Sequence, residues 1–286
     1  MIDQPQDLFT GYTPTWCSGC GNWSIGGAVK QAFTKLQLTP SSVGVVFGIG
    51  CSGNMNDFLN AYGFHGLHGR AIPTAIGWKL ANHSMPIVVV AGDGDTYGEG
   101  GNHFLHACRG NHDITIIVHD NGVYGLTTGQ VAPTALKGAK SKSTPTGIIE
   151  RPVSPLAFAI SQGATFVAQT FAGNLPHVTD TIVKAMSHKG LSVVNILQPC
   201  VTFNGVNTYQ YYLKKAYKLG EEYDPSSYSG ALMKAIEMDE EKFPLGVIYK
   251  KDLPVYHEQV PAFQTGKALL DIPKLSSLHE ILEEFR

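Results

Sequence analysis

Two residues with oxygen-bearing side chains, Asp93 and Asn121, occupy turns that directly follow apolar segments. Asp93 comes after the run Ile87 to Val90, and Asn121 comes after the run Ile114 to His119. Asn121 lies 28 positions beyond Asp93, which is enough for one turn, one helix and one strand, the shortest unit that returns a chain to an adjacent parallel position. Carboxylate and amide oxygens suit hard cations such as Mg²⁺. The spacing therefore predicts a divalent-cation site at two neighbouring strand ends.

Cysteines form the second set of residues with potential chemistry. Cys17 and Cys20 make a C-x-x-C pair, Cys51 lies in a glycine-rich turn, and Cys200 follows an apolar segment. Spacing alone leaves a redox pair, a structural zinc site and an accidental pattern open. Because Cys51 and Cys200 both follow predicted parallel strands, we expect them at the same rim of the sheet. Thiolates gathered there favour an iron–sulfur cluster or zinc over magnesium.

Gly48-Ile-Gly-Cys-Ser-Gly53 fits the G-x-G-x-x-G pattern of dinucleotide-binding folds. That pattern also requires an acidic residue about twenty positions further on, where it binds the ribose. The segment Ala71 to Ala75 offers none. A nicotinamide or flavin site is therefore the weaker interpretation, and a tight turn without a ligand stays open.

Alternating strand and helix patterns must position these residues. Short, mostly apolar segments with little alternation predict strands buried on both faces, at Val43–Ile49, Ile87–Ala91, Ile114–His119, Ala164–Gln169 and Leu191–Leu197. Helical spacing occurs before and between them, at Ser24–Leu36, Ile72–Asn82, Gly101–Arg109, Pro155–Gln162 and Leu175–His188. This order predicts an α/β fold, a mainly parallel sheet flanked by helices, with ligands at the carboxyl ends of the strands.

The remaining segments predict a long loop and a C-terminal extension. The polar stretch from Gly122 to Pro155 is expected to be a functional loop. Beyond Tyr217 the chain becomes more charged, Glu237–Lys242 is expected to end a helix, and the last residues are expected to form an arm. We therefore divide the chain into a cofactor-binding domain, residues 1–217, and an extension, residues 218–286, that packs on the same or a partner subunit.

Composition excludes some classes of function. Lys and Arg total 21 against 23 Asp and Glu, so no basic excess favours nucleic-acid binding. Charged residues make up 15% of the chain, below the roughly 25% of typical domains, which is consistent with a surface covered by another subunit. The N-terminus has no signal-peptide pattern and no apolar run is long enough to span a bilayer. We expect a cytoplasmic protein with no membrane contact and no disulfide framework.

Gly-Asp-Gly followed by Asn121 resembles the signature of thiamine diphosphate enzymes. The resemblance implies that Mg²⁺ is bound by side-chain oxygens of Asp93 and Asn121 and by the backbone carbonyl of Val123, and that the metal holds the cofactor's diphosphate. The family often has Asn-Asn at the second position, and Asp120-Asn121 here preserves the ligand.

A larger set of motifs resembles the β subunits of 2-oxoacid:ferredoxin oxidoreductases over residues 10–210. The set consists of Trp16–Asn22, Gly48–Gly53, His65–Ala71, Gly92–Asp95, Asn102–Ala107, His119–Gln130 and Leu197–Cys200. The resemblance implies a thiamine diphosphate-binding fold and a 4Fe-4S cluster held by Cys17, Cys20, Cys51 and Cys200. Cys108 matches no ligand position, and we interpret it as a small buried hydrophobe.

The resemblance also implies the cofactor contacts, which are Ile49, Gly50, Cys51, Ser52, His68, Gly94, Asp95, Gly125 and Leu126. His68 would donate to the diphosphate, Leu126 would limit the substrate side chain, and Arg70 would brace the loop. Many relatives have a basic residue where this chain has Asn54, so a role in substrate handling does not carry over there. His103 and His106 are expected to be helix residues without a metal.

The implied reaction is thiamine diphosphate-dependent oxidative decarboxylation of a 2-oxoacid, with 2-oxoglutarate favoured over pyruvate. Coenzyme A takes the acyl group, CO₂ leaves, and electrons pass through the cluster to ferredoxin, reversibly at low potential. The glutamate that activates the cofactor has no candidate here, because Glu99 is expected to be a solvated loop residue. It would come from an α subunit, so we expect an α–β heterodimer, or a dimer of it, to be the active form.

Two other hypotheses remain. The chain could belong to a non-redox thiamine diphosphate decarboxylase or carboligase, whose cysteines hold zinc or nothing. It could also be an electron-transfer subunit that carries a cluster without thiamine diphosphate. The pairing of Asp93 with Asn121 argues against the second, since such a subunit has no use for it.

Overall fold

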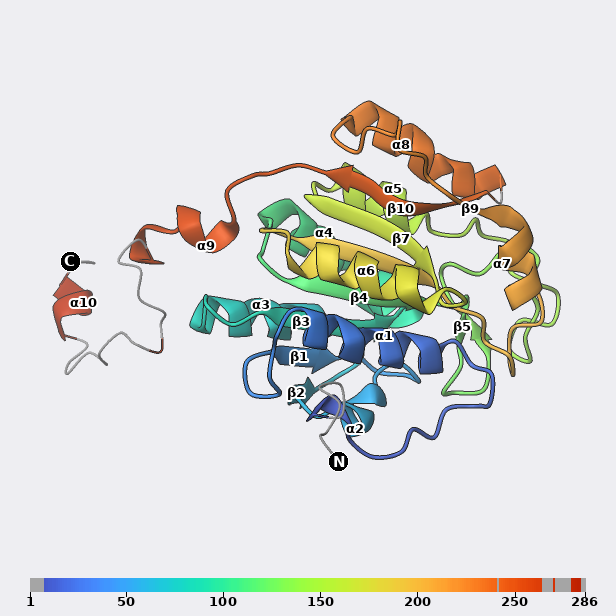
Figure 1. Ribbon diagram of the computed structural model, residues 1–286, viewed down its shortest axis with the longest axis horizontal. Helices are drawn as coiled ribbons and strands as arrows, with labels where there is room; N and C mark the ends of the chain where they lie inside the picture. Colours follow the sequence, from blue (N-terminus) through green and yellow to red (C-terminus); the bar gives the residue numbers. More distant parts are fainter. Residues whose placement is uncertain (1–7, 241, 264–269, 271–278, 284–286) are drawn as a thin grey trace.

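An eight-stranded sheet forms the centre of the computed structural model, which describes residues 8–240, 242–263, 270 and 279–283 (Figure 1). The strand order is β2-β1-β3-β4-β8-β7-β10-β9. Neighbouring strands are parallel throughout, except that β10 runs antiparallel to β7. The strands are β1 (Gly44–Phe47), β2 (Tyr62–His65), β3 (Ile87–Gly92), β4 (Thr115–Asp120), β7 (Phe166–Phe171), β8 (Ser192–Leu197), β9 (Ala216–Lys218) and β10 (Phe243–Lys250).

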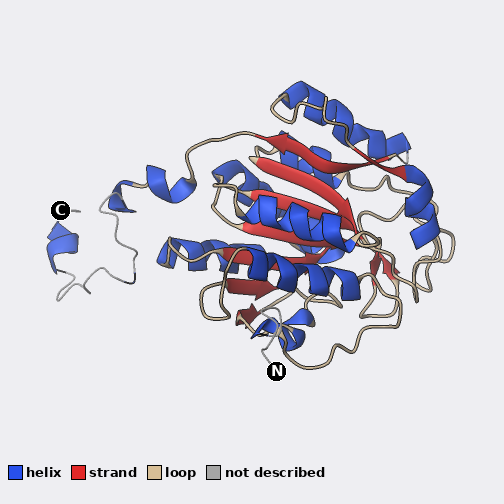
Figure 2. Cartoon of the chain, viewed as in Figure 1, coloured by secondary structure: helices blue, strands red, loops and turns tan. Residues whose placement is uncertain are grey.

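Helices cover both faces of this sheet (Figure 2). One face carries α1 (Asn22–Lys35) and α6 (Leu175–Met186), and the other carries α3 (Ala71–Ala81), α4 (Gly101–Gly110), α5 (Pro155–Ser161) and α8 (Tyr228–Ile236). Alternate residues of a strand serve the two cores: Val88 and Val90 pack toward α1 and α6, while Val89 packs toward the opposite helices. Burial on both faces explains why the strands read as unbroken apolar runs.

The predicted α/β fold is confirmed. The five predicted strands correspond to β1, β3, β4, β7 and β8, and the five predicted helices correspond to α1, α3, α4, α5 and α6, with every end within two residues of its predicted position. The long loop after β4 contains a small hairpin of β5 (Val123–Tyr124) and β6 (Gln130–Val131). The predicted helix end near Glu237 is a 3-10 turn over Glu237–Glu240 that follows α8.

Several elements were not predicted from the sequence. Strand β2 is exposed along its whole length and lies at one edge of the sheet, where backbone pairing with β1 defines it. The remaining short helices are α2 (Met55–Phe58), α7 (Tyr209–Lys215), α9 (Tyr256–Gln259), α10 (His279–Glu283), a π-helical turn at Gly94–Glu99 and a 3-10 turn at Pro261–Phe263. Such short, partly polar elements lack the periodicity that sequence patterns require.

The first part of the expected C-terminal extension adds strands to the same sheet. Strand β9 crosses the expected boundary after residue 217, and β10 lies between β7 and β9. The division at this boundary stays a prediction. Of the expected arm, residues 264–269, 271–278 and 284–286 lie outside the described residues.

No helix within the described residues is both long enough and apolar enough to cross a membrane.

Candidate functional site

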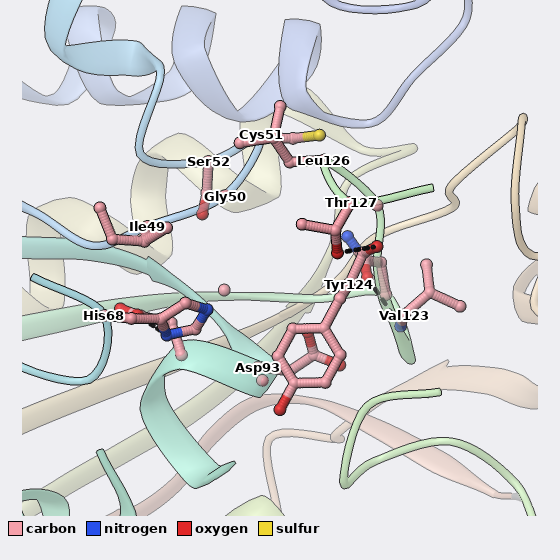
Figure 3. Close-up of a pocket in the computed structure, with 15 residues that line it drawn as sticks. Ile49, Gly50, Cys51, Ser52, His68, Asp93, Val123, Tyr124, Leu126 and Thr127 are labelled. Carbon is pink, nitrogen blue, oxygen red and sulfur yellow. Dashed lines mark hydrogen bonds and ion pairs between the residues drawn. The ribbon is translucent and has the colours of Figure 1, made fainter. Parts of the chain in front are cut away.

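A pocket with a volume of about 480 Å³ opens at the carboxyl ends of β1, β3 and β4. It is lined by Ile49, Gly50, Cys51, Ser52, His68, Gly92, Asp93, Gly94, Asp95, Asn121, Val123, Tyr124, Gly125, Leu126 and Thr127. In Figure 3, Cys51 and Leu126 lie at one end, and Asp93 and Tyr124 lie at the other. Every residue expected to contact the cofactor or magnesium lines this pocket. Their binding roles remain predictions.

Asp93 stands directly after β3 and is 2% exposed. Its Oδ2 accepts hydrogen bonds from the backbone N–H of Gly122 at 2.8 Å and from the hydroxyl of Thr134 at 2.5 Å. Burial, and then the nearby carboxylate of Asp120, raise the pKa of Asp93 to about 7. A bound cation would offset both effects, so the electrostatics of this carboxylate fit a metal ligand.

Asn121 and Val123 follow β4, the strand beside β3, as the spacing predicted. The Oδ1 of Asn121 accepts a hydrogen bond from the N–H of Val123 at 3.0 Å, and both residues are buried. A carboxylate, an amide oxygen and a backbone carbonyl form the donor set that Mg²⁺ prefers. The three residues therefore fit the expected ion by their chemistry.

His68 faces two carboxylates on the other wall of the pocket. Its Nδ1 lies 2.7 Å from Oδ1 of Asp95, an ion-pair distance whose angle falls outside hydrogen-bond geometry, and 3.4 Å from Oε2 of Glu99. Oδ1 of Asp95 also accepts from the N–H of Gly69 at 2.8 Å. A Cβ at Gly48 would come within 2.0 Å of Oδ2 of Asp95. Glycine at position 48 is therefore what allows Asp95 to enter this wall.

Tyr124 is a lining residue that the sequence did not single out. A Cβ at Gly94 would lie 2.3 Å from the Tyr124 ring, so the second glycine of Gly-Asp-Gly makes room for this side chain. The Tyr124 hydroxyl donates to Oε1 of Glu99 at 3.2 Å. Glu99 was expected to be a solvated loop residue, but it belongs to the π-helical turn and its half-exposed carboxylate is held by Tyr124.

A second pocket, with a volume of about 800 Å³, adjoins the first. Its lining residues are Thr15, Trp16, Cys17, Cys20, Asn22, Cys51, Asn54, Asn121, Gly125, Leu126, Thr128, Gln198, Cys200, Val201, Thr202 and Phe203. The four expected cluster cysteines are among them, and all four are free thiols. Cys51, Asn121, Gly125 and Leu126 line both pockets. We refer to these four residues as the common wall.

The sulfurs of Cys51 and Cys200 face the same small space. A Cβ at Gly125 would lie 3.6 Å from Sγ of Cys51 and 3.7 Å from Sγ of Cys200. Burial, and then the neighbouring Cys20, Cys200 and Cys17, raise the pKa of Cys51 to about 11. The free thiol of Cys51 therefore keeps its proton at neutral pH, and iron would displace that proton because metals bind the thiolate.

No three His, Cys, Asp or Glu side chains in the described parts of the chain are grouped so that they could hold one metal ion. In a 4Fe-4S cluster, four thiolates bind one multi-iron unit. The second pocket is lined by four cysteines, which is the number of ligands such a cluster needs.

Asn22 brings a buried polar atom without a partner to the cysteine pocket. Its side chain is fully buried, and Nδ2 has no hydrogen-bond partner within the described residues. Burial lowers the pKa of His119 to about 3, so its imidazole is neutral, and its Nδ1 lies 2.7 Å from Oδ1 of Asn22. With that oxygen occupied, Nδ2 is left as a donor. A sulfur acceptor in the pocket would satisfy it, which fits an iron–sulfur cluster.

Among the other sequence-selected residues, Cys108, His103 and Arg70 line neither pocket. Cys108 is 0% exposed inside α4, as predicted for a buried hydrophobe. Nε2 of His103 lies 2.6 Å from Nη1 of Arg70. Asn54 lines the cysteine pocket and does not line the first.

Comparison with known proteins agrees with this geometry. The family model described as "Thiamine pyrophosphate enzyme, C-terminal TPP binding domain" matches residues 48–196. A second family model, for the C-terminal part of the pyruvate ferredoxin oxidoreductase β chain, matches residues 200–265. The first pocket thus lies mainly within a thiamine diphosphate-binding domain.

Similar whole proteins point the same way. The chain is 44% identical to the β subunit of 2-oxoacid:ferredoxin oxidoreductase from Saccharolobus solfataricus over 281 residues, covering 94% of this chain and 90% of the relative. It is 44% identical to the KorB subunit of 2-oxoglutarate synthase from Archaeoglobus fulgidus over 200 residues, covering 68% and 73%. A solved 2-oxoglutarate:ferredoxin oxidoreductase from Magnetococcus marinus, with 2-oxoglutarate, coenzyme A and succinyl-CoA bound, matches with a TM-score of 0.90 at 34% identity, covering 100% and 97%.

The fold and the first pocket define a thiamine diphosphate-binding enzyme subunit. Within that class, the chain belongs to the β subunits of the 2-oxoacid:ferredoxin oxidoreductases. Membership implies an α partner and supports a role in oxidative decarboxylation of 2-oxoacids with coenzyme A.

Proposed function

We propose that this chain, together with an α subunit, converts a 2-oxoacid and coenzyme A to acyl-CoA and CO₂ and passes the two electrons through a 4Fe-4S cluster to ferredoxin. At low enough potential the same complex would run the reaction in reverse. The observation that carries the proposal is the common wall: the predicted cofactor pocket and the pocket of the four cysteines share Cys51, Asn121, Gly125 and Leu126. Electron transfer between two bound groups requires this kind of proximity.

In the first pocket, Asp93, Asn121 and the carbonyl of Val123 would hold Mg²⁺, and His68 would reach the diphosphate. When bound, thiamine diphosphate supplies the nucleophilic carbon that attacks the substrate's keto group. The chain's own contribution is to position and shield. Asp93 is fixed by two hydrogen bonds to Oδ2, and Leu126 stands between the pockets, where it would limit the substrate side chain.

In the second pocket, Cys17, Cys20, Cys51 and Cys200 would bind a 4Fe-4S cluster. When bound, such a cluster accepts single electrons. Support comes from the four free thiols around one cavity and from the unpartnered donor of Asn22. All five cysteines of the chain are free, which fits a reducing cytoplasm.

The α subunit would supply the glutamate that activates the cofactor. Among the lining residues of the first pocket there is no glutamate, and Glu99 beside it is held by Tyr124. Exposed large apolar side chains line the two pockets, namely Leu126, Val201 and Phe203. Covering them by a partner would stabilise the complex.

For the substrate we favour 2-oxoglutarate. The Magnetococcus marinus structure holds 2-oxoglutarate and succinyl-CoA, and the KorB relatives are named for 2-oxoglutarate. Pyruvate is the alternative, because the family model that matches residues 200–265 is named for pyruvate.

An anaerobic visible spectrum of the chain purified with its α partner tests the proposal. We expect the broad absorbance of an iron–sulfur cluster, bleached on addition of coenzyme A and one 2-oxoacid, with 2-oxoglutarate more effective than pyruvate. Iron and sulfide analysis after anaerobic reconstitution is the control for oxidative loss. A complex that binds thiamine diphosphate but contains neither iron nor sulfide would instead be a non-redox decarboxylase or carboligase.

A further inference from the structure

The side chain of Gln198, the first residue after β8, forms hydrogen bonds with both Asn121 and Cys20. It is 1% exposed. Its Oε1 accepts a hydrogen bond from Nδ2 of Asn121 at 3.2 Å, and its Nε2 donates to Sγ of Cys20 at 3.3 Å. Asn121 is a proposed ligand of Mg²⁺, and Cys20 is a proposed ligand of the cluster. A single buried amide therefore joins one residue of each proposed centre.

The main chain on both sides of this amide is fixed. The N–H of Gln198 donates to the carbonyl of Asp120 at 2.8 Å, and the carbonyl of Pro199 accepts from the N–H of Gly21 at 3.2 Å. A Cβ at Gly21 would come within 2.6 Å of Cγ of Gln198. Gly21, which follows Cys20, therefore leaves the space that the Gln198 side chain occupies, and any larger residue there would collide with it.

The direction of the amide follows from its partners. Oδ1 of Asn121 accepts from the N–H of Val123 at 3.0 Å, which leaves Nδ2 as the atom that Asn121 turns toward Gln198. Only the side-chain oxygen of Gln198 can accept a hydrogen bond from this N–H group, so Nε2 of Gln198 faces Sγ of Cys20. Reversing the glutamine amide would set two N–H groups against each other at Asn121.

We propose that Gln198 is a positioning residue for both centres, an inference that rests on the function proposed above. Through Asn121, it orients the amide whose oxygen would bind Mg²⁺. Through Cys20, its N–H···S hydrogen bond would stabilise the added negative charge of a reduced cluster. Outer hydrogen-bond partners of this kind orient metal ligands and tune the metal in other proteins.

Gln169 provides a matched control on the neighbouring strand β7. It is also fully buried and also makes two side-chain hydrogen bonds, donating to the carbonyl of Pro244 at 3.0 Å and accepting from Nδ2 of Asn195 at 3.1 Å. It lines neither pocket. Replacing it removes the same groups from the core without touching Asn121 or a cysteine.

The test compares Gln198→Leu, Gln198→Glu and Gln169→Leu in the complex with the α subunit. The readouts are the midpoint potential of the cluster, from redox titration followed by electron paramagnetic resonance, and the Kd for thiamine diphosphate with Mg²⁺. For Gln198→Leu we expect a more negative potential and roughly 10-fold weaker cofactor binding, the lower end of the usual effect of losing such a partner. Gln169→Leu is expected to lower thermal stability and to change neither readout.

Gln198→Glu separates the two roles. The carboxylate keeps an oxygen acceptor for Asn121 but loses the amide donor to Cys20 and adds negative charge beside it. We expect cofactor affinity nearer to wild type and a potential more negative than in Gln198→Leu. A purely structural role would move both readouts together, in step with stability.

An intact cluster with wild-type potential in Gln198→Leu, or an equal shift in Gln169→Leu, would overturn the role of Gln198. A wild-type complex without iron and sulfide would overturn the proposed function first, so the two failures are distinguishable.

A second experiment tests the hydrogen bond if the Gln198 variants do not fold, and it uses wild-type complex with ¹⁵N in its glutamine side chains. Pulsed resonance of the reduced cluster should then detect a coupled glutamine nitrogen, since Gln198 is the glutamine among the described residues of the cysteine pocket. Absence of that coupling would rule out the hydrogen bond.

Discussion

At the scale of single residues, Asp93 is a buried carboxylate of the first pocket whose pKa is raised well above its ordinary value. Its carboxylate is nearly inaccessible to water, and Asp120 lies close enough to raise its pKa further. A carboxylate with a pKa of about 7 is only partly ionised at neutral pH. A dication bound beside it would favour the ionised form, so metal binding and ionisation are coupled at this residue.

We predict that Asp93→Ala abolishes retention of thiamine diphosphate. Loss of a metal ligand removes the ion that grips the diphosphate, and the effect should exceed the roughly 10- to 100-fold that is typical of losing an outer partner. The measurement is cofactor released by acid from protein passed through gel filtration. Asp180→Ala, at an exposed position of α6, is the control and should retain cofactor. Full occupancy in Asp93→Ala would refute the assignment.

Two cysteines allow a comparison within one residue type. Cys200 lines the cysteine pocket, whereas Cys108 is a residue of α4 whose side chain is buried in the core. We predict that Cys200→Ala loses iron and sulfide after anaerobic reconstitution, while Cys108→Ala keeps both and loses on the order of 1 kcal/mol of unfolding free energy through a small cavity. Equal iron content in the two variants would count against the cluster assignment.

How much of the site the sequence reveals depends on how its residues are spaced. Asp93 and Asn121 were found because one strand–helix–strand unit separates them, and the four cysteines were found through motifs. Gln198 could not be found in this way. Its partners Asn121 and Cys20 lie 77 and 178 positions away in the sequence. A glutamine residue gives no sequence signal that predicts such distant contacts. The pairing of β8 with β4 brings Gln198 close to Asn121, and the hydrogen bond from Gly21 to the carbonyl of Pro199 holds the Cys20 segment beside it.

At the scale of elements, the hairpin of β5 and β6 separates the two pockets. Gly125 follows β5, and the N–H of Gly129 closes the turn by donating to the carbonyl of Tyr124 at 3.0 Å. Because Gly125 has no side chain, the sulfurs of Cys51 and Cys200 lie open toward it. The hairpin thus borders the cysteine pocket with backbone and leaves its volume free.

We predict that Gly125→Ala folds normally but assembles the cluster poorly. The new methyl would make ordinary contacts with the two sulfurs, at 3.6 and 3.7 Å, so the empty protein should tolerate it. The same methyl would occupy space that iron needs. The expected result is an unchanged melting temperature with reduced iron content. Gly77→Ala, where a Cβ meets nothing within 4 Å, is the control; a wild-type iron content in Gly125→Ala would contradict the prediction.

Elements were predictable where burial shaped their composition. Strands β3, β4 and β8 are buried at nearly every position, so their sequences carry an unbroken apolar signal. Strand β2 is exposed at all four positions, and its pairing with β1 leaves no such mark. Strand β10 continues the sheet from a region whose charge suggested an arm, because its pairing with β7 depends on tertiary contact.

At the scale of the whole molecule, aromatic and histidine rings of α9 contact residues that precede the amino ends of β3 and β4, at the end of the strands opposite the site. His257 stacks on His83 with ring centroids 4.6 Å apart, and Tyr256 lies 4.4 Å from His112. Burial, and then the charge of His257, lower the pKa of His112 to about 4. These contacts therefore favour the neutral forms of His112 and His257.

We predict that the protein loses stability as pH falls from about 6.5 toward 4. In that window the unfolded chain binds a proton at His112 while the folded chain does not, so the free energy of unfolding falls with pH. Thermal melting at several pH values measures the slope. His112→Phe keeps an aromatic ring and should reduce the slope, whereas His106→Phe, at an exposed position of α4, should not; the lowered pKa values of other histidines such as His119 leave part of the slope in place. An unchanged slope in His112→Phe would contradict the assignment.

The common wall also constrains how this chain can evolve. Cys51, Asn121, Gly125 and Leu126 each belong to two pockets, so one substitution there alters two environments at once. Such a mutation is pleiotropic, because a substitution that improves function in one pocket also changes the other pocket and can impair it. Adaptation to a new substrate should therefore accumulate first at residues that serve one pocket only, such as Asn54 and Thr127. The wall itself should change slowly and in compensated pairs.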